Sequence, residues 1–211
     1  MNSAQFITVE GIEGAGKSTC MEVVAQRVAA AGRELLVTRE PGGTPLGEEL
    51  RDLLLSHRHT GMDDDTELLL MFAARAEHLR ARIEPALKQG RWVLSDRFTD
   101  ATYAYQGYAR GIPLDRIALL EQWVQAALRP HLTILLDLPV ELGLARAGRR
   151  SAPDRFEREQ QAFFERVRNG YLARAAAEPK RFRVIDASHT LGDVKRSIEH
   201  AVDVFIAEVT S

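Results

Sequence analysis

Residues 11–19 read GIEGAGKST and directly follow the apolar run FITVE at residues 6–10. The stretch matches the pattern G-x-x-x-x-G-K-[ST], which joins a strand to a helix in nucleotide-binding proteins. The matching residues are Gly11, Gly16, Lys17 and Ser18. Glycines let backbone N–H groups converge on a phosphate, and the start of the following helix adds partial positive charge. We therefore predict a phosphate-binding loop, in which Lys17 reaches the terminal phosphates and Ser18 ligates Mg²⁺.

Two other classes of nucleotide-binding protein are disfavoured. The dinucleotide-binding pattern G-x-G-x-x-G fails because Thr19 occupies its third glycine position. The N-K-x-D element that reads guanine is absent, since neither Asn2 nor Asn169 precedes a lysine. The candidates that remain are an ATPase that uses hydrolysis mechanically and a kinase. We expect the whole loop to contact ATP, through Gly11, Ile12, Glu13, Gly14, Ala15, Gly16, Lys17, Ser18 and Thr19.

The composition is that of an ordinary globular chain. Its 211 residues are 45% hydrophobic, enough for one sizeable core, and we expect a single domain over residues 1–211. No apolar stretch approaches the roughly 20 residues that span a bilayer, and the start MNSAQFITVE does not resemble a signal peptide, so we expect a cytoplasmic protein. The net charge of −2 gives no general attraction to nucleic acid or membranes.

Apolar runs alternate with segments of helical periodicity along the chain. The predicted strands are Gln5–Glu10, Glu34–Thr38, Trp92–Ser95, Leu132–Leu138 and Phe182–Ala187. The predicted helices are Lys17–Ala31, Leu46–Ser56, Thr66–Gln89, Asp115–Leu128, Val140–Ala147, Glu157–Glu178 and Leu191–Val209. Most strands are continuously apolar, as expected when both faces of a parallel sheet are covered. The pattern predicts a three-layer α/β/α domain with a parallel sheet.

Charged residues follow two of the predicted strands. Arg39 and the turn Pro41-Gly42-Gly43 come after the second strand, and Asp96 and Arg97 come after the third. Strand carboxyl ends open on one edge of a parallel sheet, so these residues should converge on the phosphate-binding loop, where Asp96 would face Mg²⁺. A kinase brings together about four negative charges on ATP and two on a monophosphate acceptor, and therefore needs cations on the acceptor side. Arg75 is a further candidate.

Five segments together resemble the bacterial thymidylate kinases, which convert dTMP and ATP to dTDP and ADP. They are GIEGAGKST, TREPGGT, LLMFAAR, SDRFTDATYAYQG and ARAGRRSAPDRFE. The resemblance runs from about residue 5 to residue 210. It implies a P-loop kinase fold with strand order 2-3-1-4-5, a homodimer, and ATP with Mg²⁺ as the phosphate donor.

The resemblance also implies roles on the acceptor side. The residues that match Arg97 and Arg75 hold the acceptor phosphate and base, and Glu13 lies near the acceptor sugar and phosphate. Thr102, Tyr105 and Gln106 line the nucleoside pocket, where the tyrosine crowds the 2′ position of the sugar. With Arg39, Pro41, Met71 and Phe72, these residues complete the predicted acceptor site.

One position departs from the family pattern. The phenylalanine that stacks on the base precedes the helix arginine by four residues in the family. Here Phe72 precedes Arg75 by three residues, and Met71 occupies the other position. Stacking on an aromatic face favours Phe72, whereas the helical register favours Met71.

The predicted phosphate loop carries no arginine, so the positive charge that some family members place there must come from elsewhere. The segment ARAGRRSAPDR provides Arg146, Arg149, Arg150 and Arg155, of which the last three lie in residues 148–155. We expect residues 148–155 to form a mobile lid that closes over ATP and presents one of these arginines to the transferred phosphoryl group. Two alternatives remain open: another nucleoside monophosphate kinase, which would differ around residues 98–108, and a phosphate-loop switch ATPase.

Overall fold

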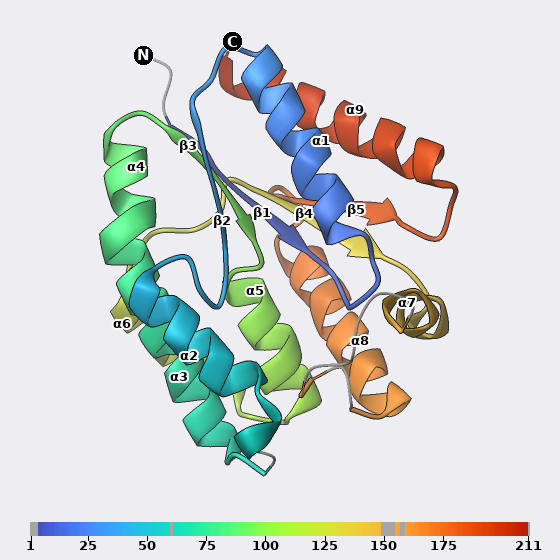
Figure 1. Ribbon diagram of the computed structural model, residues 1–211. Helices are drawn as coiled ribbons and strands as arrows, with labels where there is room; N and C mark the ends of the chain where they lie inside the picture. Colours follow the sequence, from blue (N-terminus) through green and yellow to red (C-terminus); the bar gives the residue numbers. More distant parts are fainter. Residues whose placement is uncertain (1–3, 60, 149–154, 157–158, 211) are drawn as a thin grey trace.

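A parallel sheet lies at the centre of the computed structural model, which describes residues 4–59, 61–148, 155–156 and 159–210. Among these residues the sheet has five strands in the order β2-β3-β1-β4-β5 (Figure 1), which confirms the predicted order. The strands are β1 (Phe6–Glu10), β2 (Leu35–Arg39), β3 (Trp92–Asp96), β4 (Leu132–Asp137) and β5 (Phe182–Asp186).

The register of the central strands positions the predicted site. β1 is buried along its whole length and pairs with β3 on one side and β4 on the other. Val9 of β1 lies opposite Asp96 of β3. The phosphate-binding loop, which leaves β1 one residue later, therefore begins beside Asp96 and Arg97.

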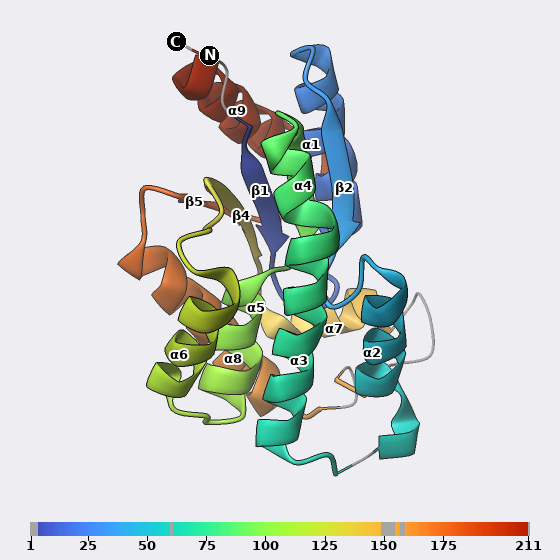
Figure 2. The same cartoon turned by 90° about the vertical axis from the view of Figure 1, so that its left-hand side faces the viewer.

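Helices cover both faces of the sheet. The α-helices are α1 (Lys17–Ala30), α2 (Pro45–Leu55), α3 (Asp64–His78), α4 (Glu84–Lys88), α5 (Thr99–Thr102), α6 (Leu114–Gln125), α7 (Val140–Ala147), α8 (Gln161–Ala177) and α9 (Leu191–Thr210). Helices α1 and α9 pack together on one face, and α5 and α8 lie on the other (Figures 1 and 2). In the described part of the chain no helix is both long enough and apolar enough to span a bilayer.

The predicted helix Thr66–Gln89 is divided in the structure. Between α3 and α4 lies a short π-helix, η2 (Leu79–Ile83), which ends two residues before Pro85. Proline has no backbone N–H, and its ring clashes with the carbonyl four residues earlier, here that of Ala81. The wider turn lets the helical run continue through the proline instead of ending there.

A helical segment that the sequence did not reveal lies between β3 and α6. It consists of α5 and a second π-helix, η3 (Tyr103–Ala109). The backbone N–H of Arg110 donates to the carbonyl of Tyr105 at 3.0 Å, a bond that spans five residues. Aromatic residues and Gly107 lower the helix propensity of this stretch, and packing against α8 stabilises it instead. This segment carries Thr102, Tyr105 and Gln106.

Candidate active site

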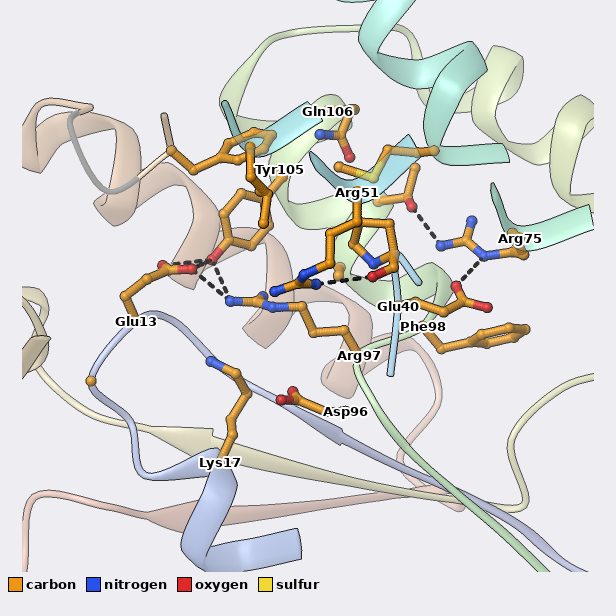
Figure 3. Close-up of a pocket in the computed structure, with 17 residues that line it drawn as sticks. Glu13, Lys17, Glu40, Arg51, Arg75, Asp96, Arg97, Phe98, Tyr105 and Gln106 are labelled. Atoms are coloured by element: carbon orange, nitrogen blue, oxygen red, sulfur yellow. Dashed lines mark hydrogen bonds and ion pairs between the residues drawn. The ribbon is translucent and has the colours of Figure 1, made fainter. Parts of the chain in front are cut away.

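A cavity opens at the carboxyl edge of the sheet, next to the phosphate-binding loop (Figure 3). Glu13, Gly14, Lys17 and Asp96 line its loop side. Pro41, Met71, Arg75, Arg97, Thr102, Tyr105 and Gln106 line the remainder. The fold therefore brings into one cavity residues that lie up to 143 positions apart, from Glu13 to Phe156.

The phosphate-binding loop depends on glycine at two positions. Gly11 has a φ of +142°, and a Cβ there would lie 2.6 Å from the carbonyl oxygen of Leu136. A Cβ on Gly14 would lie 1.9 Å from the carbonyl oxygen of Gly143 in α7. Any larger residue would push the loop away from β4 and α7, so the loop's shape follows from close backbone packing as well as from backbone conformation.

Lys17 is held inside the loop. Its Nζ donates to the carbonyl oxygens of Gly11 at 3.1 Å and Ile12 at 3.0 Å. Burial and the charge of Arg97 lower the pKa of Lys17 to about 8, although Glu13 and Asp96 oppose this shift. A phosphate group entering the loop would stabilise the ammonium form and raise this pKa again.

Asp96 ends β3 with one side-chain oxygen unused. Its Oδ1 is buried and has no hydrogen-bond partner among the described residues. A buried acceptor without a partner is costly unless a ligand, ion or water satisfies it. Ser18, in the first turn of α1, is exposed. A carboxylate and a hydroxyl are both oxygen ligands of the kind that Mg²⁺ prefers.

Arg97 is the centre of a partly buried hydrogen-bonded cluster. Its Nη2 donates to Glu13 Oε1 at 2.6 Å and to the hydroxyl of Tyr105 at 3.1 Å, and its Nη1 donates to Tyr171 at 2.9 Å. The Tyr105 hydroxyl in turn donates to Glu13 at 2.7 Å. Arg97 has a φ of +68°, a strained value for a residue other than glycine. The cluster holds the guanidinium in place despite this strain.

Charge also controls Glu13. Burial alone would raise the pKa of Glu13, but the charges of Arg97 and Lys17 hold it below its ordinary value. Glu13 is thus an anion between two cations at the boundary of the loop and the rest of the cavity. An incoming phosphate would meet the same two cations.

Arg75 forms a second buried cluster at the far end of the cavity (Figure 3). Its Nε donates to Glu40 Oε2 at 2.7 Å and its Nη2 donates to Thr102 at 3.0 Å. The remaining Nη1 is buried without a hydrogen-bond partner in the described structure. His78 contacts the other oxygen of Glu40 at 3.0 Å. Glu40 therefore fixes Arg75 so that one donor is left for a ligand.

The register of α3 places Met71 and Phe72, the two candidates for contact with the base, in different surroundings. Met71 lines the cavity. Phe72 is 2% exposed and belongs to an apolar cluster with Tyr103 and Ile117. The centre of the Phe72 ring lies 4.9 Å from the guanidinium carbon of Arg75. The ring of Phe98, which does line the cavity, has its centre 5.1 Å from the same carbon.

Two arginines near the turn after β2 differ from expectation. Arg39 has a side chain 53% exposed, pairs with Glu48 at 2.7 Å, and does not line the cavity. Arg51 of α2 lines the cavity, and its Nη1 donates to the carbonyl of Pro41 at 2.9 Å. No sequence pattern indicated Arg51, because a charged residue within an amphipathic helix is usually solvated.

Of the three predicted lid arginines, only Arg155 is described. Its Nη2 donates to Glu67 Oε2 at 2.6 Å and its Nε donates to the carbonyl of Leu54 at 2.8 Å. Arg155 does not line the cavity, although the neighbouring Phe156 does. Arg149 and Arg150 lie outside the described residues.

The chain is similar to known proteins along nearly all of its length. Residues 9–198 match the family model described as thymidylate kinase. A curated thymidylate kinase of Pseudomonas fluorescens is 59% identical, over 92% of each chain. One of Cupriavidus metallidurans is 57% identical, over 94% of this chain and 97% of the relative. The crystal structure of thymidylate kinase from Ehrlichia chaffeensis superposes with a TM-score of 0.76 at 32% identity, covering 97% and 99% of the two chains.

Proposed function

Since the chain belongs to the thymidylate kinase family and transfers the γ-phosphoryl group of ATP to dTMP, we propose that the cavity binds the two substrates head to head. ATP phosphates would occupy the loop of residues 11–19, and dTMP would occupy the side lined by Arg97, Tyr105 and Arg75. The observation that supports this assignment is that Lys17 and Arg97 line the same cavity, with the Glu13 carboxylate under the influence of both charges. Each cation can neutralise one of two polyanions.

The acceptor base would lie at the end of the cavity formed by Arg75. The free Nη1 of Arg75 is a donor for the O4 carbonyl of thymine, and Gln106 and Thr102 lie on the same side of the cavity. Met71 and Phe98 supply apolar contact for the ring. Glu13 and Tyr105 would lie at the sugar, and Arg97, Arg51 and Arg39 would contribute positive charge near the phosphate.

The chemistry needs no general base. An oxygen of the dTMP phosphate, already anionic, attacks the γ-phosphorus, and the bond from that phosphorus to the β,γ-bridging oxygen breaks. The electron pair of the broken bond stays on the β-phosphate of ADP. The chain's contribution is to align the reacting groups, neutralise charge through Lys17 and Arg97, and exclude water so that transfer exceeds hydrolysis.

Mg²⁺ fits the residues beside the loop. Ser18 and the unsatisfied Oδ1 of Asp96 would hold it. When bound, the ion neutralises charge on the β- and γ-phosphate oxygens. Residues 148–155 are proposed as a lid, with Arg149 or Arg150 presenting charge to the transferred group, since Arg155 is bound to Glu67 and Leu54.

We also propose a homodimer. Helix α6 exposes Leu119 and Trp123, with 72% and 81% of their surfaces accessible, and α3 beside it exposes 57% of Leu69. Leu119 and Trp123 are four residues apart and share one face of the helix. A second copy of the chain would remove this apolar surface from water. The single domain over residues 1–211 and a cytoplasmic location remain part of the proposal.

A panel of acceptors tests the assignment. ADP release is measured in a coupled assay with dTMP, dUMP, UMP, CMP, AMP and GMP, and without acceptor. We expect the highest kcat/KM with dTMP and little ADP release without acceptor. The same rate of ADP release with and without an acceptor would indicate an ATPase. Faster turnover with another monophosphate would indicate another kinase of this fold.

A further inference from the structure

We propose that Glu67 is a positioning residue that orients the side-chain amide of Gln106, so that its carbonyl oxygen faces the acceptor base. The inference rests on the proposed placement of that base in the cavity. Glu67 itself does not line the cavity. It would influence base selection only through Gln106.

Glu67 is fully buried in the first turn of α3 and receives donors on both oxygens. Its Oε1 accepts from Nε2 of Gln106 at 2.7 Å. Its Oε2 accepts from Nη2 of Arg155 at 2.6 Å, and Nη2 of Arg110 lies 3.5 Å away. The Glu67 carboxylate faces these two guanidinium groups, and a carboxylate can only accept hydrogen bonds. The amide NH₂ of Gln106 must therefore point at Glu67.

This contact leaves the opposite end of the Gln106 amide for a ligand. Gln106 lines the cavity, and its Oε1 has no hydrogen-bond partner within the described residues. Figure 3 shows this oxygen on the side of the amide that faces the other cavity residues. The cavity thus presents an acceptor on Gln106 and a donor on Arg75.

That pattern discriminates between pyrimidines. Thymine offers an N3–H donor beside its O4 acceptor, which complements an acceptor and a donor. Cytosine offers an N3 acceptor beside an amino donor, so it would leave mismatched polar groups in a buried site. A buried polar group without its partner costs more affinity than a lost apolar contact. The polarity of Gln106 therefore matters as much as its position.

Arg155 keeps Glu67 from rotating. In addition to its contact with Glu67, its Nε donates to the carbonyl of Leu54 at 2.8 Å. Its backbone N–H donates to the carbonyl of Leu55 at 3.2 Å. The guanidinium thus joins the end of α2 to the start of α3. Every oxygen of Glu67 is occupied, which is the condition under which a buried polar network specifies one arrangement.

The substitution Glu67→Gln should invert this polarity while keeping the size of the side chain. Arg155 can only donate, so the new amide would turn its oxygen to Arg155 and its NH₂ to Gln106. Gln106 would then have to turn its carbonyl oxygen away from the cavity. We expect KM for dTMP to rise by about tenfold or more, with a fall in the preference for dTMP over dCMP and little change in KM for ATP.

Glu121→Gln is the matched control. Glu121 is 5% exposed and, like Glu67, contacts a glutamine and an arginine. Its Oε1 lies 3.3 Å from Nε2 of Gln125 and 2.8 Å from Nε of Arg129. Glu121 does not line the cavity. We expect this variant to lose thermal stability without changing KM for dTMP or the base preference. Equal changes in the two variants would reduce Glu67 to a structural ion pair and overturn the inference.

A double-mutant cycle tests whether Glu67 acts through Gln106. In the Gln106→Ala background, Glu67→Gln should cause no further change in base preference. The same loss in both backgrounds, or a folded Glu67→Gln variant with wild-type KM and preference, would overturn the inference. If Gln106→Ala alone leaves KM for dTMP unchanged, the proposed placement of the base is wrong and the inference falls with it.

Nuclear magnetic resonance keeps the inference testable if Glu67→Gln does not fold. The experiment uses the wild-type protein. The signal of the Gln106 side-chain NH₂ is the one that disappears from the spectrum of the Gln106→Ala variant. We expect its protons to exchange slowly with water before ligand is added, and to remain protected after dTMP binds. Fast exchange in the free protein, or loss of protection on binding dTMP, would show that Glu67 does not hold the amide.

Discussion

The proposed donor and acceptor sides of the cavity are built in different ways. The donor side is one continuous loop after β1, shaped by Gly11 and Gly14 and presenting mainly backbone groups. The acceptor side is assembled from side chains of α2, α3, η3 and the end of β3. The first can be recognised from a short pattern of residues. The second exists only when distant elements come together.

The two sides also differ in how their cations are held. Lys17 contacts two backbone carbonyls, which are neutral. Arg97 and Arg75 are bound to carboxylates, Glu13 at 2.6 Å and Glu40 at 2.7 Å. These ion pairs keep the guanidinium groups in position before the acceptor arrives. In the proposed arrangement, the acceptor phosphate would share Arg97 with Glu13.

The largest effect is expected for Lys17→Ala on the donor side. Lys17 is the only lysine that lines the cavity in the described structure. Removing a cation that faces the transferred group should lower kcat by about a thousandfold or more. Steady-state kinetics with ATP and dTMP would measure this, with circular dichroism as a control for folding. A variant with full activity would refute the loop assignment.

Arg97→Ala should separate the two sides. We expect kcat/KM for dTMP to fall by about a hundredfold, because the acceptor phosphate loses a charged donor. KM for ATP should change far less. Equal losses for both substrates would remove Arg97 from the acceptor side and weaken the division of the cavity proposed above.

Tyr105→Ala should have a smaller effect, on sugar selection. Its ring lies in the cavity and its hydroxyl donates to Glu13 at 2.7 Å. Removing the ring opens space for a 2′-hydroxyl, so the preference for dTMP over UMP should fall by about tenfold. Tyr105→Phe is the control, since it retains the ring and removes only the hydroxyl. An unchanged ratio in Tyr105→Ala would place the sugar elsewhere.

The smallest effect concerns Glu10, the fully buried last residue of β1. Burial, and then the charge of Asp100, raises the pKa of Glu10 from 4.5 to about 8. The folded protein therefore binds more protons than the unfolded chain between these pH values, and this contribution to stability falls as the pH rises from 4.5 to 8. Thermal unfolding from pH 5 to pH 8 should show a shallower decline in Glu10→Gln. Parallel curves would contradict the raised pKa.

Several features could be predicted from the sequence because they depend on neighbouring residues. The strand, glycine loop and helix of residues 6–30 follow from apolar patterning and from the conformations that glycine allows. The order of the strands was implied by the family resemblance, and the structure confirms it. Segment η3 was missed because its helix is stabilised by packing against α8 rather than by its own propensity.

Residue patterns along the chain were enough to predict a phosphate-binding loop and to identify the parallel α/β fold and the family. Tertiary packing placed Arg51 and not Arg39 at the cavity, placed Met71 rather than Phe72 there, and brought Glu67 to Gln106. The two kinds of feature differ in the range of the interactions that decide them. Backbone conformation is set by neighbours along the chain, whereas the partner of a side chain depends on how separate elements pack.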